Sequence, residues 1–124
     1  MRYWQDEVRD IAAVAAAALT QSGHDRKIYD ITGPEPLTPP ELASQLSEAL
    51  GKTIAFVDIP ESVMRSALLS FGFPEWQADG LVEDYAHYRR GEASAVSRTV
   101  QDVTGLPPRT FREFADDYRH AFLK

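Results

Sequence analysis

Five aromatic side chains gather between residues 71 and 88, where they flank the junction of two predicted helices. They are Phe71, Phe73, Trp76, Tyr85 and Tyr88. Aromatic faces along one wall of a pocket suit a planar ligand, such as a quinone or another small planar carbonyl compound. The hydroxyls of Tyr85 and Tyr88 could orient the carbonyl oxygen of that ligand. The alternative is that the rings belong to the core, or to an interface with another part of a larger protein.

No other polar residues occur at a spacing that catalysis or metal binding requires. The three histidines are scattered, at His24, His87 and His120, and surface positions explain them. Two pairs of adjacent carboxylates, Glu83–Asp84 and Asp116–Asp117, would point about 100° apart on a helix, so neither pair shares a proton. Neither Ser94 nor Ser97 lies in a nucleophile elbow. We therefore predict no catalytic residue and no metal ligand in this chain.

A strand–helix–strand unit is predicted over residues 27–60. Lys27–Thr32 alternates and is β-prone, and Thr53–Ile59 forms the second strand. Between them the capping box Thr38–Glu41 opens a helix, which Gly51 closes. Two strands joined by a single helix usually lie parallel, with a right-handed crossover. Because parallel sheets normally have both faces covered, this unit is expected to be part of something larger.

Helices dominate the rest of the chain. The first is predicted to begin with Asp10 as its N-cap and to end near Gly23, and capping explains Asp10 without an ion pair to Arg9. Further helices are predicted over residues 61–71, from 76 to about 90, over 98–104, and from the capping box at 110–113 to 122. We therefore predict one α+β domain over residues 1–124. It is helix-dominated, with five to six helices and a small two-stranded parallel β-α-β unit.

The composition narrows the classes of partner. The 124 residues carry a net charge of −6, and an acidic surface repels phosphate backbones, so nucleic acid is an unsuitable partner. The absence of cysteine rules out disulfides and thiolate sites. The longest apolar run, residues 11–19, is too short and too rich in alanine to span a bilayer, and no signal core precedes it. We expect a cytoplasmic protein with no membrane contact.

Four stretches of the sequence, in order along the chain, resemble the C-terminal, substrate-side part of NmrA-like proteins, which are atypical short-chain dehydrogenases/reductases. They are Val8–Ala15, Ile28–Thr38, Gly72–Trp76 and Val103–Phe111. The resemblance spans nearly the whole chain and implies that the aromatic group lies over the nicotinamide end of a substrate pocket. Residues 5–7 differ from the family pattern, because in the family a strand usually leads into the first helix at this point.

The resemblance also implies an N-terminal Rossmann half, for which this sequence carries no signal. A dinucleotide fingerprint needs clustered glycines, whereas the seven glycines here are dispersed, at positions 23, 33, 51, 72, 80, 91 and 105. The superfamily's catalytic tyrosine and lysine lie four residues apart. Tyr85 and Arg89 have that spacing, but arginine stays protonated and cannot relay a proton. NAD(P) is thus implied for the intact family, and no cofactor for this chain alone.

Two functions remain open at this point. In the first, the chain is the substrate-side region of an NmrA-like NAD(P)-dependent oxidoreductase or redox sensor, and it is inactive alone because the dinucleotide-binding half is missing. In the second, it is a self-associating regulatory module without enzymatic activity, because a homodimer would cover the apolar surface that the absent half leaves exposed. The partner is accordingly a Rossmann half or a second copy. An independent enzyme is disfavoured, because no titratable residues cluster at motif spacing.

Overall fold

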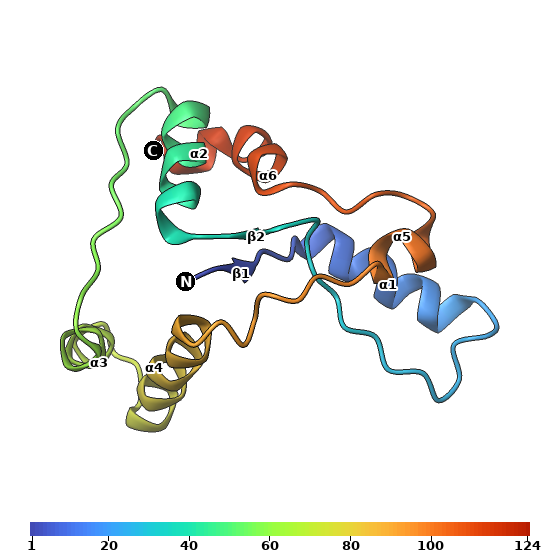
Figure 1. The fold of residues 1–124 in the computed structure, drawn as a ribbon, viewed down its shortest axis with the longest axis horizontal. Helices are drawn as coiled ribbons and strands as arrows, with labels where there is room; N and C mark the ends of the chain where they lie inside the picture. The colour runs from blue at the N-terminus through green and yellow to red at the C-terminus, as the bar shows by residue number, and fades with distance from the viewer.

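Seven helices and one two-stranded sheet make up the chain, and long irregular segments connect them (Figure 1). A computed structural model describes all of residues 1–124. The strands are β1 (Tyr3–Trp4) and β2 (Pro36–Leu37). The helices are α1 (Val8–Thr20), α2 (Pro39–Leu50), α3 (Glu61–Ser70), α4 (Glu75–Arg89), α5 (Thr99–Thr104), α6 (Phe111–Asp117) and α7 (Arg119–Phe122). The prediction of a helix-dominated α+β chain is confirmed.

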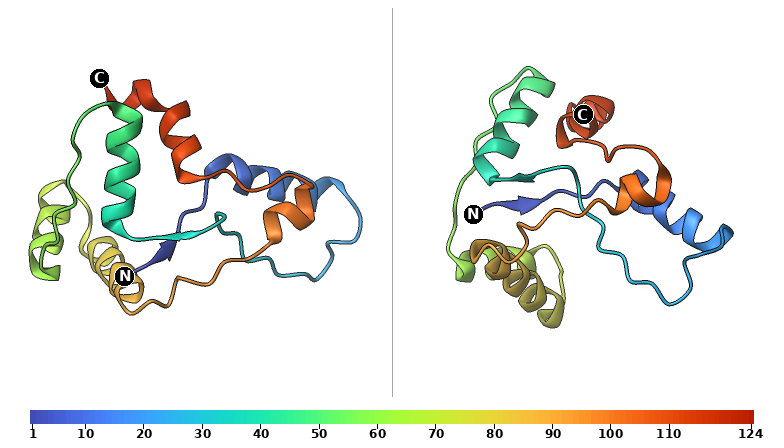
Figure 2. Two further views of the ribbon diagram at one scale, coloured as in Figure 1. Left: turned by 45° about the horizontal axis from the view of Figure 1, so that its top comes forward. Right: turned by 45° about the vertical axis from the view of Figure 1, so that its right-hand side comes forward.

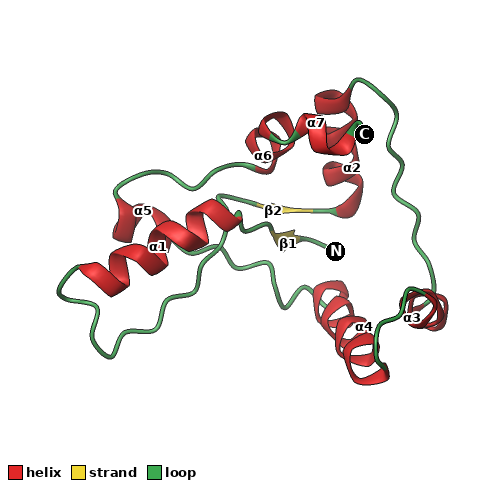
Figure 3. Ribbon diagram, turned by 180° about the vertical axis from the view of Figure 1, so that it is seen from behind, coloured by secondary structure: helices red, strands yellow, loops and turns green.

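The predicted parallel strands, by contrast, are wrong. The only sheet pairs β1 with β2 in the antiparallel sense, with Tyr3 opposite Leu37 and Trp4 opposite Pro36 (Figure 3). The segments 27–32 and 53–59 are both extended and irregular, and neither belongs to the sheet. A strand needs a neighbour to pair with, and β-propensity alone does not supply one. In this structure neither segment has such a neighbour.

The close approach of residues 33 and 5 holds β2 beside the start of the chain. Gly33 is buried, and a Cβ atom built on it would overlap the backbone carbonyl oxygen of Gln5. Only glycine lets the two backbones come this close. The first residues of the chain therefore lie directly against the segment that leads into α2.

Helix α1 begins earlier than predicted. Glu7 is its N-cap, and its side chain accepts a hydrogen bond from the backbone N–H of Arg9 (3.0 Å). Asp10 lies inside the first turn, is only 4% exposed, and accepts hydrogen bonds from the backbone N–H (2.7 Å) and the guanidinium of Arg109. The predicted N-cap role of Asp10 is therefore wrong. Asp10 makes no ion pair with Arg9, as predicted, but it does make one with Arg109. The helix ends at Thr20, three residues before Gly23, which has a φ of +92°.

Helix α2 has the predicted capping box. Glu41 donates its backbone N–H to the Thr38 hydroxyl (3.3 Å) and accepts the Thr38 backbone N–H on its carboxylate (2.8 Å). Arg2 adds two hydrogen bonds to the same carboxylate, at 2.7 and 2.9 Å. Gly51 ends the helix in the left-handed conformation, at φ 68°. The local signals therefore place both ends of this helix correctly.

Replacing Thr38 by alanine is expected to lower the free energy of unfolding by about 1 kcal/mol, because one N-terminal backbone donor of α2 loses its acceptor. Urea denaturation of the two proteins measures the difference. Thr53→Ala is the matched control, since Thr53 is exposed and makes no side-chain hydrogen bond, and it should change the value by less than about 0.5 kcal/mol. Equal losses in the two variants would contradict the capping role.

The remaining helices confirm the predicted order. α3, α4 and α5 fall within one to two residues of their expected bounds, and Gly105 ends α5 at φ 75°. Thr110 and Glu113 form the second capping box, with backbone-to-side-chain bonds of 3.0 and 2.7 Å. The last predicted helix is interrupted at Tyr118, which separates α6 from α7. No helix of the chain is both long enough and apolar enough to cross a membrane.

The helices pack as pairs around the small sheet. α2 lies against α6 and α7, α1 against α5, and α3 against α4 (Figure 2). Small side chains fill the contacts: the buried apolar residues are Val14, Ala17, Leu37, Ala49, Leu50, Ala78, Ala93, Val100 and Ala115. No large side chain is fully buried. Each pair therefore has only a thin core of its own.

The chain exposes more surface than a compact protein of its size. Its accessible surface is 8321 Å², whereas a folded monomer of 13.9 kDa exposes about 6,700 Å². The excess of about 1,600 Å² exceeds the roughly 800 Å² that one partner buries in a protein–protein interface of standard size. The packing within these 124 residues therefore leaves a surface of the size that another folded body covers.

Candidate active site

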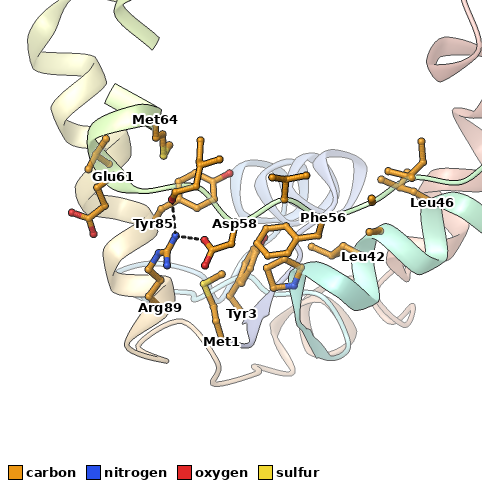
Figure 4. Close-up of a pocket in the computed structure, with 17 residues that line it drawn as sticks. Met1, Tyr3, Leu42, Leu46, Phe56, Asp58, Glu61, Met64, Tyr85 and Arg89 are labelled. Atoms are coloured by element: carbon orange, nitrogen blue, oxygen red, sulfur yellow. Dashed lines mark hydrogen bonds and ion pairs between the residues drawn. The ribbon is translucent and has the colours of Figure 1, made fainter. Parts of the chain in front are cut away.

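A pocket of about 350 Å³ lies between β1, α2, the extended segment 54–59, α3 and α4 (Figure 4). Apolar side chains make up most of its wall, with Leu42 and Leu46 on the side of α2 and Met64 on the side of α3. The charged residues at its edge are Asp58, Glu61 and Arg89. An apolar cavity with a few convergent polar groups is the usual form of a small-molecule site.

Three aromatic residues from separate elements shape this pocket. β1 supplies Tyr3, the extended segment supplies Phe56, and α4 supplies Tyr85. The ring of Tyr88 supports Tyr3 from behind: the two rings are stacked, with centroids 4.7 Å apart and planes at 7°. Tyr88 also meets Tyr85 edge-to-face at 5.4 Å. The pairing of Tyr3, Tyr85 and Tyr88 thus fixes one aromatic wall across a contact between β1 and α4.

An ion pair lies at the edge of the pocket. The Arg89 Nη2 group donates to Asp58 Oδ1 (2.6 Å) and to the Ile59 carbonyl oxygen (3.3 Å). Both charged side chains are about half exposed, so the pair adds little to stability. The Nε and Nη1 groups of Arg89 have no protein partner. These free N–H groups can donate to an oxygen or nitrogen atom of a ligand in the pocket.

The predicted aromatic group does not form a single wall. Tyr85 lines the pocket, and Tyr88 lies behind Tyr3. Phe71 is 80% exposed, Trp76 is 76% exposed, and Phe73 is half-buried at the turn between α3 and α4. Nine residues of helix place Trp76 about 13 Å from Tyr85 along the axis of α4. Phe71 and Trp76 therefore face outward at the far end of this helix pair.

Sequence reasoning missed four residues of the site: Tyr3, Phe56, Asp58 and Arg89. They come from three segments that are distant in sequence, and no motif spacing links them. The one available signal was the spacing of Tyr85 and Arg89, which places both residues on the same face of α4.

Tyr88 is expected to ionise at a higher pH than an ordinary tyrosine. Burial, and then its hydrogen bond to Asp84 (2.8 Å), raise the pKa of Tyr88 to about 12. Because this pKa lies above the ordinary value of 10.0, the neutral phenol adds stability below pH 10 that is lost as the pH rises through about 12. Titration of the tyrosinate absorbance measures the step. Tyr88→Phe should remove the step near pH 12, and an unchanged curve would contradict the assignment.

The pocket has no cluster of metal ligands, and no helix N-terminus in it is suited to a dinucleotide phosphate. No group of three or more histidines and carboxylates converges anywhere in the chain. Pro39, at the start of α2, lines the pocket, but neither Pro39 nor the following Pro40 has an N–H group to donate to a phosphate. The pocket thus offers aromatic and apolar contacts, and polar contacts only at its edge.

Comparison with known proteins gives close relatives. No known protein-family model matches this chain. The NAD(P)H azoreductase of Xenophilus azovorans is 43% identical over 119 residues, which cover 96% of this chain and 41% of the azoreductase. The structure of the NADPH-dependent quinone oxidoreductase QOR2 of Escherichia coli with NADPH superposes with a TM-score of 0.82 and 28% identity, covering 98% of this chain and 42% of that protein. The structure of the triphenylmethane reductase of Citrobacter with NADP(H) superposes with a TM-score of 0.79 and 28% identity. The match covers 95% of this chain and 41% of that protein.

The chain therefore spans about two fifths of the length of the relatives it matches. Two of these three relatives are NAD(P)H-dependent by name, and the third is a reductase in complex with NADP(H). The match over nearly the whole of this chain, and over less than half of each relative, is consistent with a segment of a reductase of this kind.

Proposed function

We propose that this chain is the substrate-side segment of an NmrA-like NAD(P)H-dependent reductase, and that the pocket beside Tyr3, Phe56 and Tyr85 binds a planar conjugated acceptor such as a quinone. The observation that carries the proposal is the 43% identity to an azoreductase over 96% of this chain. A relationship at this level, together with the same fold in QOR2, makes a shared overall reaction the simplest explanation.

The geometry of the pocket supports a planar acceptor. The rings of Tyr3, Phe56 and Tyr85 offer flat apolar surfaces for stacking, which favours conjugated ligands over saturated ones. The free N–H groups of Arg89 provide donors for a carbonyl oxygen or an azo nitrogen. NAD(P)H, when bound by the rest of such a reductase, supplies the hydride. The residues of this chain then hold and orient the acceptor.

Phe71 and Trp76 have a different role in this proposal. Both are large, apolar and exposed at the turn between α3 and α4, which leaves them available to the part of the reductase that binds the dinucleotide. Phe73 lies between these two residues in sequence, at the same turn, and its side chain is half-buried. We propose that this turn closes one side of the substrate site only when the second part is present.

The test uses a hybrid in which this chain replaces the matched region of the Xenophilus azovorans azoreductase. The hybrid should oxidise NADPH in the presence of a naphthoquinone or an azo dye, and the isolated chain should not. A ligand that binds only the native state raises the melting temperature of a protein. Because the rest of the reductase is proposed to bind NADPH, this ligand should leave the melting temperature of the isolated chain unchanged. Turnover by the isolated chain, or a folded hybrid that reduces neither acceptor, would contradict the proposal.

Tyr85→Ala in the hybrid tests the pocket itself. Loss of the ring is expected to raise KM for the naphthoquinone by about tenfold, since an aromatic pair adds up to about 1.5 kcal/mol. Val63→Ala is the control, because Val63 is half exposed on α3 and lies outside the pocket. An equal KM in the two variants would place the acceptor elsewhere.

A second function, the self-associating module, is favoured by the same excess of exposed surface. It requires a dimer of the isolated chain at micromolar concentration, which light scattering would detect. A monomer over a wide range of concentration would exclude it and leave the reductase segment.

A further inference from the structure

A second, open hollow of about 420 Å³, called here the outer hollow, adjoins the pocket beside Tyr3, Phe56 and Tyr85. Five of the seven residues that line the outer hollow also line the pocket. The ion pair between Asp58 and Arg89 is among these shared residues. A substituent on a ligand that fills the pocket therefore enters the outer hollow beside this ion pair.

The extended segment before α3 holds the guanidinium of Arg89 in place. The Nη2 group of Arg89 donates to Asp58 Oδ1 (2.6 Å) and to the Ile59 carbonyl oxygen (3.3 Å). Figure 4 shows the side chains of Arg89 and Asp58 pointing toward one another at the edge of the pocket. Tyr85 precedes Arg89 by four residues on α4, so both side chains lie on the same face of the helix. A ligand stacked on the Tyr85 ring thus lies beside the free Nε and Nη1 donors of Arg89.

No other charged side chain lines the outer hollow. Its remaining lining residues are Met1, Thr38, Pro39, Pro40 and Phe56. The start of α2 offers no donor to a negative group, because the prolines have no N–H and the backbone N–H of Thr38 donates to Glu41 (2.8 Å). Asp58 is thus the one negative side chain beside the one positive side chain, and it offsets the charge of Arg89.

We propose that Asp58 is a specificity-determining residue. By pairing with Arg89, it makes the site favour planar acceptors with an uncharged, hydrogen-bond-accepting substituent over acceptors with an anionic one. This inference rests on the proposed function and adds the charge specificity of the same pocket. An arginine without a partner attracts a sulfonate or a carboxylate, whereas the neighbouring carboxylate of Asp58 repels it. Glu61, the remaining charged residue of the pocket, is also negative and adds to this repulsion.

Equilibrium binding to the isolated chain tests the role of Asp58. Titration calorimetry measures Kd for a naphthoquinone and for its sulfonate, two ligands that differ by one anionic group. Asp58→Asn removes the charge and keeps an amide oxygen that accepts from Arg89. It should therefore raise the affinity for the sulfonate, relative to the neutral quinone, by about fivefold. Arg89→Gln should shift this ratio in the opposite direction, and the variant with both changes should return it close to the original value.

Asp79→Asn is the matched control. Asp79 is 56% exposed, against 61% for Asp58, and it pairs with Arg65 outside both hollows. This variant loses the same charge from the chain, so it should leave the affinity ratio unchanged. An equal ratio in Asp58→Asn and Asp79→Asn would overturn the role of Asp58. A failure of both ligands to bind at millimolar concentration would overturn it as well.

The hybrid with the azoreductase separates this inference from the proposed function. In the hybrid, Asp58→Asn should shift the ratio of kcat/KM for the two acceptors in the same direction as the ratio of affinities. Turnover of the naphthoquinone with no such shift would overturn the role of Asp58 and leave the proposed function standing. A shifted binding ratio in a folded hybrid that reduces neither acceptor would support the role of Asp58 and count against the proposed function.

Discussion

Replacing Gly33 by alanine is expected to destabilise the chain by about 3 kcal/mol, which is the upper part of the range for overpacking a tight contact. The added methyl group would overlap the backbone carbonyl oxygen of Gln5. A backbone atom cannot move aside as a flexible side chain can, so the segment leading into β2 must shift away from the start of the chain. Urea denaturation measures the loss, and the pairing of β1 with β2 should weaken with it.

Gly80→Ala is the control for this prediction, with the opposite sign. Gly80 lies inside α4, and nothing is within 4 Å of the position that a Cβ atom would occupy. Alanine is favoured over glycine in a helix interior by about 1 kcal/mol, so this variant should gain stability. A destabilisation by Gly80→Ala equal to that of Gly33→Ala would show that the close approach of residues 33 and 5 is not the cause.

Replacing Asp10 by alanine is expected to lower the free energy of unfolding by about 3 kcal/mol. The buried carboxylate accepts both the backbone N–H and the guanidinium of Arg109, which lies 99 residues away in sequence. Its removal leaves a backbone donor and a partly buried charge without a partner. Because Glu7 also pairs with Arg9, and Arg9 with Asp117, this network ties α1 to the start and end of α6. Urea denaturation measures the loss.

The control for Asp10 is Asp102→Ala. Asp102 is exposed and meets Arg98 only at 3.9 Å along α5, so its removal should cost less than about 1 kcal/mol. Asp10→Asn should fall between the two, since the amide oxygen can still accept the Arg109 N–H while the charge is lost. A loss below about 1 kcal/mol for Asp10→Ala would mean that the Asp10–Arg109 ion pair does not hold α1 against the segment that leads into α6.

The helices could be predicted from sequence because their signals are local. Thr38 with Glu41, and Thr110 with Glu113, are each three residues apart, so a capping box is complete within one turn. The start of α1 was missed because glutamate is a poor N-cap by preference, and the stronger N-cap type, Asp10, stood three residues later. The partner that explains Asp10 is Arg109, and no local pattern reveals a contact across 99 residues.

The sheet and the pocket could not be predicted from the sequence, for the same physical reason. A strand is defined by a partner, and residues 27–32 and 53–59 have none within this chain. The pocket likewise joins Tyr3, Phe56 and Tyr85 from three segments. Of the residues predicted on α4, Tyr85 lines the pocket and Tyr88 packs against Tyr3 behind it. Trp76, on the same helix, does not line the pocket, because it lies about 13 Å from Tyr85 along the helix axis.

The thin core has a consequence for the way this chain unfolds. The sensitivity of folding to denaturant and the heat capacity of unfolding both scale with the surface that unfolding newly exposes. Only 13 of 124 residues are buried, and the excess of about 1,600 Å² is already exposed in the folded state, so unfolding newly exposes less surface than for a compact protein of this length. The denaturant slope should be shallow, and the heat-capacity change should lie below the about 1.5 kcal/mol/K that is typical for this length. Attachment to a second folded body would steepen both.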